Sequence, residues 1–207
     1  MKVLSLMVGP IMTNCYILCD EEAKVCAVID PGDEPKRIEA MIASSGCTPI
    51  MILLTHGHFD HCTGVAGLLE TWPELPVYIH EGDVTDGMGG ELRFRRLGEK
   101  NQRYYKEGDK LTVGGLTLDV LETPGHSTGS VCLLVEGQGV LFAGDTLFRG
   151  SCGRCDFPGG DYRAMLKSLA RLGRLEGQYT VYPGHDSATD MDYERKYNPY
   201  MKQGMNV

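Results

Sequence analysis

The stretch LLTHGHFDHCTG, residues Leu53–Gly64, follows an apolar run and places four metal-ligand side chains within six consecutive positions. Three of them are histidines, half of the six in the chain, and the fourth is an aspartate. With the chain's own residue frequencies, the pattern His-x-His-x-Asp-His arises by chance with a probability on the order of 10⁻³ or less. Because clusters of His and Asp indicate a metal or catalytic site, the stretch predicts one at His56, His58, Asp60 and His61.

Three further apolar runs end in short loops that deliver a residue of a metal-ligand type. LDVLETPG is followed by His126, VLFAG by Asp145 and YTVYPG by His185. Loops at strand ends are where a rigid scaffold places functional side chains. The candidate ligands of the whole chain are therefore His56, His58, Asp60, His61, His126, Asp145 and His185.

This ligand set is large enough for two ions. Because residues 56, 58 and 60 alternate in an extended turn, Asp60 and His61 can face away from His56 and His58. The predicted groups are His56, His58 and His126 for the first ion and Asp60, His61 and His185 for the second, with the carboxylate of Asp145 bridging them. Imidazole and carboxylate ligands suit Zn(II), Fe and Mn, whereas closed structural zinc sites favour Cys. We expect two divalent ions per chain, with zinc as the first choice.

The apolar patterns predict strands that are separated by single helices. The predicted strands are Val3–Val8, Cys15–Leu18, Val25–Ile29, PIMILLT, PVYIH, Leu116–Glu122, Val131–Glu136, Val140–Ala143 and YTVYPG. Four helices are predicted. The first starts at Asp33–Pro35 and stops at Gly46, the second covers GVAGLLETW, the third covers Asp161–Leu172, and the fourth follows the last strand. Glu81–Asp109 is predicted as a loop with short helical pieces that forms a lid. This order predicts an α/β layered sandwich.

The composition limits the class of protein. At 207 residues the chain can bury a core, and we expect a single domain over residues 1–207. A net charge of −8 disfavours a nucleic-acid partner, and the absence of a run of about 18 apolar residues disfavours a membrane partner. The start, MKVLSLMVGPIMTNCYILCD, does not resemble a signal peptide, so we expect a cytoplasmic location. The eight cysteines are expected to be mostly buried and free of disulfides.

The motifs THGHFDH, TPGHSTGS, FAGDTLFRGSCGRCDFPGGD and YPGHD resemble the metallo-β-lactamase superfamily, and within it the glyoxalase II branch of small hydrolases. The match runs from GPIMTNCYIL near the start to ERKYNP near the end. The resemblance implies a four-layer αββα sandwich with mixed sheets and a two-metal site at one edge. It also implies a substrate contact from Arg154, which stands in the place of a basic residue that contacts glutathione in hydroxyacylglutathione hydrolase.

Hydroxyacylglutathione hydrolase also has a C-terminal helical domain that helps to hold glutathione. This chain ends 22 residues after His185, so we expect that domain to be lacking. The tyrosine that the family places two positions after the last metal histidine is Ser187 here.

The ligand set and the resemblance together predict a hydrolase. Two divalent ions that share a water lower its pKa toward neutrality, and the resulting hydroxide attacks a carbonyl carbon. Asp60 is predicted to be the catalytic residue, because it binds the second ion and orients this hydroxide. A thiolate leaving group, from a thiol with a pKa of about 8.5, hardly needs a general acid. We therefore expect hydrolysis of small thioesters such as S-2-hydroxyacylglutathione.

Other functions remain open at this point. The motifs also resemble those of persulfide dioxygenases, which hold one iron through the equivalents of His56, His126 and Asp145. A lactonase, or another hydrolase of the superfamily, would keep both ions. A metal-binding protein without activity is disfavoured, because a structural zinc needs only four ligands.

Several residues near the motifs have a simpler interpretation. His80, at the end of PVYIH, is expected to be hydrogen-bonded scaffold. Cys152 and Cys155 form a CxxC, but without a second pair we expect no redox role, and we expect Cys62 to be a packed thiol. The basic residues of the predicted lid are expected to form a solvated face and not an anion-recruiting rim. They are Arg93, Arg95, Arg96 and Lys100.

Overall fold

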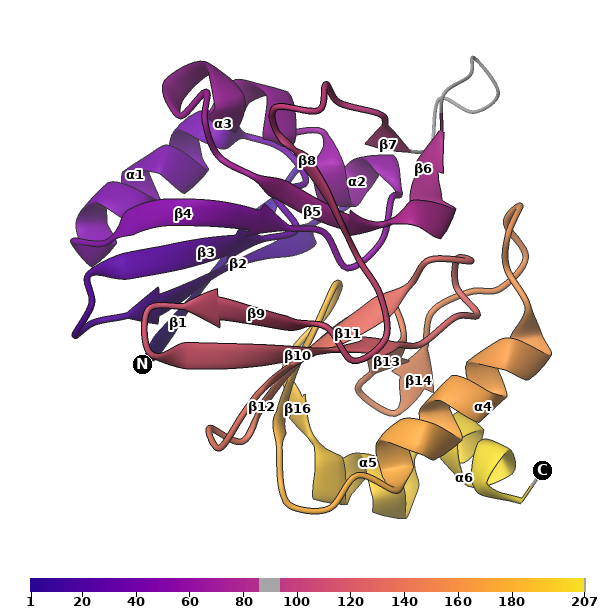
Figure 1. Cartoon of the computed structure of the whole chain (residues 1–207). Coiled ribbons are helices and arrows are strands. Elements are labelled where there is room, and N and C mark those ends of the chain that lie inside the picture. The colour runs from indigo at the N-terminus through magenta and orange to yellow at the C-terminus, as the bar shows by residue number, and fades with distance from the viewer. Residues whose placement is uncertain (86–93, 207) are drawn as a thin grey trace.

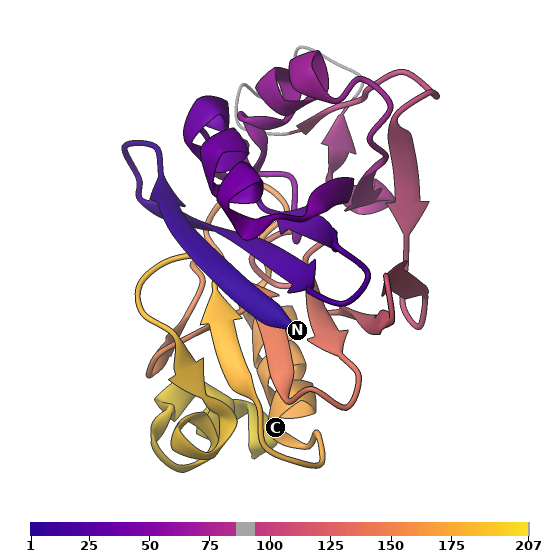
Figure 2. The ribbon, with the colours of Figure 1, turned by 90° about the vertical axis from the view of Figure 1, so that its left-hand side faces the viewer.

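The structure is a computed structural model, and it describes residues 1–85 and 94–206. Two six-stranded sheets face each other in this part of the chain, and helices cover the outer face of each (Figure 1). In the view of Figure 2, the purple helices and the yellow C-terminal helices lie at opposite ends of the molecule. The layers follow the order helix, sheet, sheet, helix, which confirms the predicted αββα sandwich.

The first sheet comes from the N-terminal half of the chain. Its spatial order is β1 (Lys2–Val8), β2 (Thr13–Asp20), β3 (Val25–Ile29), β4 (Thr48–Leu53), β5 (Val77–His80) and β8 (Gln102–Tyr105). The β1–β2 and β2–β3 pairs are antiparallel, whereas the β3–β4, β4–β5 and β5–β8 pairs are parallel. Because parallel strands end at the same edge of a sheet, the loops after β3, β4 and β5 all begin at one edge.

The second sheet comes from the C-terminal half. Its spatial order is β16 (Thr189–Asp190), β15 (Thr180–Pro183), β12 (Val140–Gly144), β11 (Val131–Val135), β10 (Leu116–Glu122) and β9 (Lys110–Val113). The β12–β15 pair is parallel, and the β10–β11 and β11–β12 pairs are antiparallel. Strands β10, β12 and β15 therefore run in the same direction, and their carboxyl ends share an edge. Both sheets are mixed in this way, as predicted.

Shorter elements complete the architecture. Two further strand pairs are β6 (Val84–Thr85) with β7 (Phe94–Arg95) and β13 (Leu147–Phe148) with β14 (Ser151–Cys152). The helices are α1 (Pro35–Ser45), α2 (Phe59–Cys62), α3 (Val65–Thr71), α4 (Tyr162–Gly173), α5 (Met191–Tyr197) and α6 (Pro199–Met205), with a 3₁₀ turn η1 at Glu81–Asp83. None of the helices in the described ranges is long and apolar enough to cross a membrane.

Three layers of buried apolar side chains hold the sandwich together. The middle layer joins the two sheets, and in it the rings of Tyr16 and Phe142 lie 5.4 Å apart. One outer layer packs α1 and α3 on the first sheet, and the other packs α4 to α6 on the second. Since full burial of one Leu, Ile or Phe side chain stabilises a fold by roughly 1.5–3 kcal/mol, these layers fix the two sheets that carry the loops of the site.

The boundaries of α1 and α4 follow from local chemistry. Helix α1 begins with Pro35 and ends at Gly46, whose φ of 70° is readily adopted by glycine. Helix α4 begins after Asp161, whose side chain accepts a hydrogen bond from the backbone N–H of Ala164. Its apolar residues at three- and four-residue spacing face the second sheet, as the sequence predicts.

The predicted lid, Glu81–Asp109, contains strands as well as loops in the structure. Residues 86–93 lie outside the described residues, but β6 pairs with β7, and β8 is a paired strand at the edge of the first sheet, so the loop assignment is wrong there. The hydroxyl of the buried Tyr105 donates to the carbonyl of Leu54. The short polar run QRYY has little strand signal of its own, and its pairing comes from this tertiary contact and from β5. Strand β9, which follows, was also not predicted.

Candidate metal centre

The ends of strands from both sheets meet at one edge of the sandwich. The segment after β4 carries His56 and His58, and α2, which follows it, carries Asp60 and His61. The three strands of the second sheet that share a direction deliver the remaining residues in the loops that follow them: His126 after β10, Asp145 after β12 and His185 after β15. All seven sequence-predicted ligands are therefore in the described part of the chain and converge there.

The first predicted group is compact and buried. The ligand atoms of His56, His58 and His126 all lie within 4.8 Å of one another. The shortest separation, 2.8 Å, joins Nδ1 of His58 and Nε2 of His126. Three imidazoles that point at one spot suit a divalent transition metal.

The second predicted group is equally close but more open. The ligand atoms of Asp60, His61 and His185 also lie within 4.8 Å of one another. Nε2 of His185 is 3.2 Å from Oδ2 of Asp60, and these two side chains keep 19% and 15% of their surface exposed. The second group is therefore more accessible to solvent than the first.

Asp145 lies between the two groups. Its Oδ1 is 3.4 Å from Nε2 of His61, and its Oδ2 is 3.4 Å from Nε2 of His126 and 3.5 Å from Nε2 of His185. One carboxylate therefore faces ligands of both groups, which is the geometry that a bridging carboxylate requires. Gly184 makes this approach feasible, because a Cβ at that position would overlap Oδ1 of Asp145.

Unpaired buried atoms test whether this cluster fits metal ions. In the described residues, the buried side-chain atoms without a hydrogen-bond partner are His56 Nε2, His61 Nε2, Asp145 Oδ1 and Gln102 Nε2. Burial of an unsatisfied polar atom costs roughly 1–3 kcal/mol, so such atoms are rare in native proteins. Three of the four belong to one mutually close group of candidate ligands, His56, His61 and Asp145. A cation at the cluster would satisfy these three together, so the residues fit a metal.

Hydrogen bonds from behind orient three of the imidazoles. Nδ1 of His61 is 2.9 Å from Oδ2 of Asp30, and Nδ1 of His126 is 2.7 Å from the backbone carbonyl of Arg154. Nδ1 of His56 lies 3.2 Å from the hydroxyl of Thr55. When Nδ1–H donates to such a partner, the lone pair of Nε2 is free to face a metal.

Burial and nearby charges shift the pKa values of three histidines of the cluster in different directions. Burial and the neighbouring imidazoles lower the pKa of His56 well below its usual value and that of His58 to about 4. Burial also opposes a charge on His61, but the carboxylates of Asp145 and Asp30 outweigh it and raise the pKa of His61 to about 9. His56 and His58 are therefore neutral at pH 7 and ready for a metal, whereas an ion bound by His61 must displace a proton.

The sequence interpretation missed Asp30. This aspartate is 2% exposed and follows β3, and its carboxylate also accepts hydrogen bonds from the backbone N–H and the hydroxyl of Thr55, at 2.8 and 2.7 Å. It thus holds both His61 and the segment that leads from β4 to His56. The signal was present, because Asp30 directly follows the apolar run VCAVI just as Asp145 directly follows VLFAG.

Asp30→Asn is expected to weaken metal binding, at the second ion above all, because Asp30 contacts His61 directly and His56 only through Thr55. An amide nitrogen accepts no hydrogen bond, so in either orientation of the amide at least one donor of His61 or Thr55 loses its partner. Loss of such an orienting partner typically costs about 10–100-fold in metal affinity. Competition between the protein and a zinc chelator measures this change. Glu194→Gln is the control, because Glu194 is also buried but accepts from Thr189 and Asn198. Equal affinities in Asp30→Asn and the parent protein would contradict the assigned role.

The other singled-out residues lie where a structural role is natural. His80 is not in the ligand set: its Nδ1 accepts from the backbone N–H of Gly82 at 3.0 Å, and its Nε2 lies 3.1 Å from Glu122. All eight cysteines are in described positions and are free, and six are buried. Burial raises the pKa of Cys152 to about 12, so this thiol is protonated at neutral pH. Cys62 is buried, as expected of a packed thiol.

The basic residues of the predicted lid mostly face solvent. Arg93 lies outside the described residues, Arg95 is exposed, and Lys100 pairs with Glu74. Arg96 donates to the hydroxyl of Tyr104. We expect charge reversal at Arg95 and Lys100 to leave KM unchanged, because solvent screens these groups. Initial rates over a range of substrate concentrations test this, and a severalfold increase in KM would show that the residues recruit anions.

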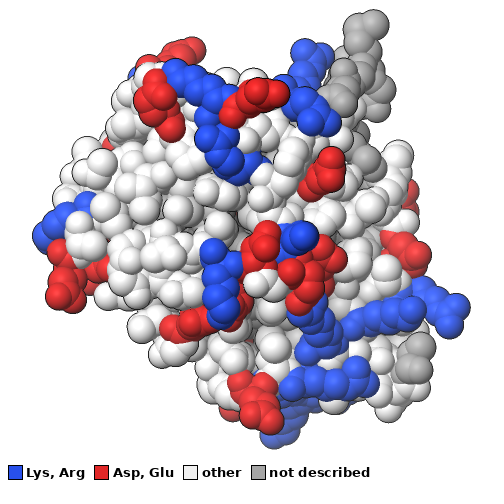
Figure 3. All heavy atoms as spheres, in the orientation of Figure 1, with Lys and Arg blue, Asp and Glu red and all other residues white. Residues whose placement is uncertain are grey.

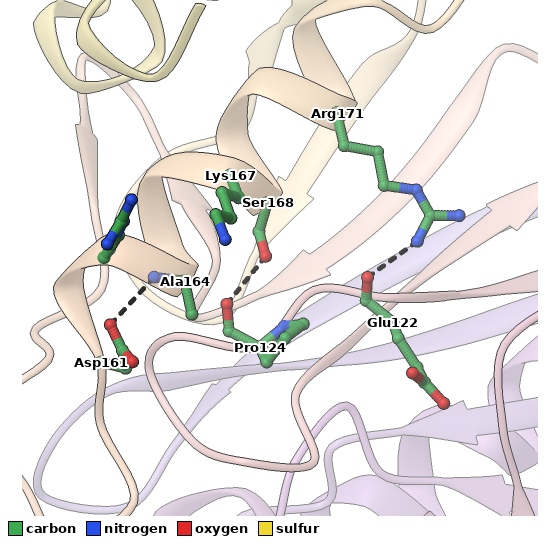
Figure 4. A pocket seen from close by; sticks show the side chains of 8 residues that line it. Glu122, Pro124, Asp161, Ala164, Lys167, Ser168 and Arg171 are labelled. Atoms are coloured by element: carbon green, nitrogen blue, oxygen red, sulfur yellow. Dashed lines mark hydrogen bonds between the residues drawn. The ribbon is translucent and has the colours of Figure 1, made fainter. Parts of the chain in front are cut away.

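A hollow with a volume of about 410 Å³ lies beside α4 and outside the ligand cluster (Figure 4). The hydroxyl of Ser168 donates to the carbonyl of Pro124 at 2.7 Å, and the guanidinium of Arg171 donates to the carbonyl of Glu122 at 2.8 Å. Lys and Arg side chains line this side of the molecule over α4, with acidic groups close by (Figure 3). These contacts tie α4 to the segment that leads from β10 to His126.

The sandwich and its edge cluster of His and Asp define a class of metal-dependent enzymes. The profile of the Metallo-beta-lactamase superfamily matches residues 8–185. The chain belongs to the metallo-β-lactamase superfamily, as the motifs predict, and is a metallo-hydrolase of that group.

Two curated relatives match nearly the whole chain. The probable metallo-hydrolase YqgX of Bacillus subtilis (strain 168) is 37% identical over 97% of this chain and 98% of its own length. The hydroxyacylglutathione hydrolase GloC of Haemophilus influenzae (strain ATCC 51907 / DSM 11121 / KW20 / Rd) is 31% identical over 97% of this chain and 98% of its own length.

Solved structures show the same fold. TTHA1623 in a di-iron-bound form has a TM-score of 0.80 and 36% identity, and the match covers 95% of this chain and 99% of that one. The BLEG-1 B3 metallo-beta-lactamase has a TM-score of 0.84 and 31% identity, with 97% and 99% covered. ETHE1 from Myxococcus xanthus has a TM-score of 0.82 and 28% identity, with 100% and 91% covered. The similar structures thus include a di-iron form.

Proposed function

We propose that this protein hydrolyses small thioesters, in the manner of hydroxyacylglutathione hydrolases, with two divalent ions at the edge cluster. The observation that carries the proposal is that six of the candidate ligands form two close groups and that Asp145 faces members of both. The first ion would be held by His56, His58 and His126, and the second by Asp60, His61 and His185. Imidazole and carboxylate donors favour zinc, with iron and manganese as alternatives, and the likeness to GloC supports the substrate class.

Two bound divalent ions would supply an attacking water of near-neutral pKa and polarise the substrate carbonyl. The chain's own part is to fix Asp60 as the residue that orients this water. The hydroxyl of Thr13 donates to Oδ2 of Asp60 at 3.2 Å, and Nε2 of His185 lies at the same distance from that oxygen. These two contacts, from β2 and from the loop after β15, hold the carboxylate from opposite sheets.

The surroundings of the cluster suit a leaving group that needs no protonation. The ring of Phe157 lies edge-on to His58, with centroids 5.8 Å apart, and that of Phe148 lies edge-on to His185 at 6.1 Å. These neighbours are apolar walls and cannot donate a proton. A thiolate leaves readily because the parent thiol has a pKa of about 8.5, whereas an amine would need a general acid. The walls therefore favour thioesters over amides.

Arg154 is proposed to contact an anionic group of the thiol portion. Its guanidinium is paired with both carboxylate oxygens of Asp156, each at 2.6 Å, and lies 4.0 Å from the ring centroid of Phe157. Its side chain retains 58% exposure. A substrate carboxylate would take the place of Asp156 on the same guanidinium, next to the aromatic wall beside His58. We further propose a cytoplasmic location and small-molecule partners.

Metal content and turnover together test the function. The protein as purified is analysed for metals by elemental mass spectrometry against protein concentration, and thioesters are then screened with S-lactoylglutathione first. About two ions per chain and measurable thioester turnover are expected. A single iron with oxygen consumption would indicate persulfide oxidation instead, and two ions with lactone but not thioester hydrolysis would overturn the substrate class. A chain that binds no metal after reconstitution would overturn the proposal.

A further inference from the structure

Asp83 is a buried carboxylate outside the ligand cluster. It ends the η1 turn and is 2% exposed. Its Oδ2 accepts hydrogen bonds from the backbone N–H of Gly57 at 2.9 Å and from the hydroxyl of Ser127 at 2.6 Å. Its Oδ1 accepts from the backbone N–H of Gly129 at 2.7 Å. Both carboxylate oxygens thus accept hydrogen bonds from donors on two other segments.

These donors lie beside the ligands of the first ion. Gly57 separates His56 from His58, and Ser127 directly follows His126. One carboxylate therefore joins the segment after β4 to the loop after β10, although the bonded residues are 26 and 44 positions away from it in the chain. The three hydrogen bonds involve no member of the second group.

The position of Asp83 is itself fixed from both sides. His80 begins the η1 turn by accepting the N–H of Gly82, and its other ring nitrogen faces Glu122 at the end of β10. Ser130, 2.6 Å from the hydroxyl of Ser127, completes the polar contacts behind the loop of His126. A Cβ at Gly57 would overlap the backbone oxygen of Asp83, so the two segments are in direct contact.

We propose that Asp83 is a positioning residue for the first ion. It sets the separation between the backbone of His56–His58 and that of His126, just as Asp30 orients His61 in the second group. The inference rests on the two-ion assignment of the proposed function. Ligands need to be held to within about 0.5 Å of their productive geometry, and Nδ1 of His58 and Nε2 of His126 are only 2.8 Å apart. Release of either segment would separate this pair.

Asp83→Asn tests the inference by metal binding, with no substrate present. An amide nitrogen cannot accept a hydrogen bond, so at least one of the three donors loses its partner in either orientation of the amide. Zinc affinities are measured by competition with a chelator on the full-length protein. The expected result is a loss of about 10–100-fold in affinity for one ion, with the affinity for the other unchanged.

Combination with ligand variants identifies which ion is affected. If the first ion is weakened, Asp83→Asn adds little to His58→Ala, which already removes a ligand of that ion, but its effect persists in full in His185→Ala. Such non-additivity is the sign that two residues act on one site. The reverse pattern, additive with His58→Ala and silent with His185→Ala, would overturn the inference.

Asp20→Asn is the matched control for general loss of a buried carboxylate. Asp20 is 8% exposed and accepts from the backbone N–H groups of Glu22, Ala23 and Gly115, at the opposite end of β2 from Thr13. The Asp20→Asn variant is expected to have a lower Tm in the metal-free state, with the ratio of the two zinc affinities unchanged. An equal loss at both ions in Asp83→Asn, matching a fall in Tm, would show a merely structural role.

Ser127→Ala provides a second test if Asp83→Asn does not fold. It removes one of the three hydrogen bonds and leaves the carboxylate in place, so a smaller loss at the same ion is expected. Unchanged zinc binding in both variants would overturn the inference. Failure of the parent protein to bind two ions would instead overturn the proposed function, so the two failures are distinguishable.

Discussion

Replacing Asp60 with Asn is expected to reduce kcat for thioester hydrolysis by at least about 100-fold. The carboxylate belongs to the second group and is held by Thr13 and His185, each at 3.2 Å from Oδ2. An amide of the same size keeps the shape but loses the negative charge that binds the ion and orients the attacking water. Loss of a residue that only orients a metal ligand reduces activity by about 10–100-fold, so loss of a ligand itself should reduce kcat further. Steady-state kinetics on the zinc-loaded protein measure the effect.

The control for Asp60→Asn is the same change at Asp119. Asp119 lies on β10, is partly exposed, pairs with Lys110 at 2.7 Å and belongs to neither ligand group. This variant is expected to retain the parent kcat. His58→Ala should behave like Asp60→Asn, because it removes a ligand of the first ion. A rate near that of the parent in either ligand variant would refute the two-ion assignment.

Removal of the metals is expected to abolish turnover and to lower the Tm by roughly 5–10 °C. A ligand at 100 times its Kd stabilises the folded state by about 2.7 kcal/mol, and 1 kcal/mol shifts the Tm by about 2–4 °C for a chain of this size. Without ions, three buried atoms of the cluster have no hydrogen-bond partner: Nε2 of His56, Nε2 of His61 and Oδ1 of Asp145. The rings of His56 and His61 are also only 4.1 Å apart between centroids. Differential scanning fluorimetry before and after exhaustive chelation measures the shift.

Re-addition of single metals is the control for chelation. Zinc is expected to restore both the Tm and the turnover, and parallel titrations with iron and manganese rank the alternatives. Recovery with iron alone, together with oxygen uptake, would move the assignment toward a dioxygenase. A protein that keeps its Tm and its activity after complete loss of metal would contradict a metal-dependent mechanism.

The fold was predictable wherever a segment carries its own pattern. Helix α4 has its apolar residues at three- and four-residue spacing behind Asp161, and β4 is a continuous apolar run. Strands β8 and β9 are different, because QRYY and KLTV are only four residues long and each contains two polar residues. Strand β8 pairs with β5, which is distant in the chain, and is also held by the contact between Tyr105 and Leu54. Strand β9 pairs with the antiparallel strand β10, which follows it. A single segment does not carry such information.

The convergence of the candidate ligands was predictable, because each is a His or an Asp, residue types that bind metals, and each follows a strand. The residues that support them were not, because their roles arise only where the loops cross. Asp30 meets His61 at 31 positions away in the chain, and Asp83 meets Gly129 at 46. Asp30 did carry a local signal as the end of an apolar strand. Asp83 follows a strand by three residues in a turn, and nothing in that turn separates it from a solvated acid.

The order of the ligands along the chain has a consequence for biosynthesis. His56, His58 and His126 have all been made when residue 126 is added, but the second group waits for His185, another 59 residues later. At 5–20 residues per second, roughly 3–12 s of translation separate the two events. The nascent chain thus contains all ligands of the first group well before it contains all ligands of the second. The last loop then joins the structure through the N–H of Asn14, which donates to the carbonyl of Gly184 at 2.7 Å. This hydrogen bond joins a strand made early in translation to the loop that carries the last candidate ligand.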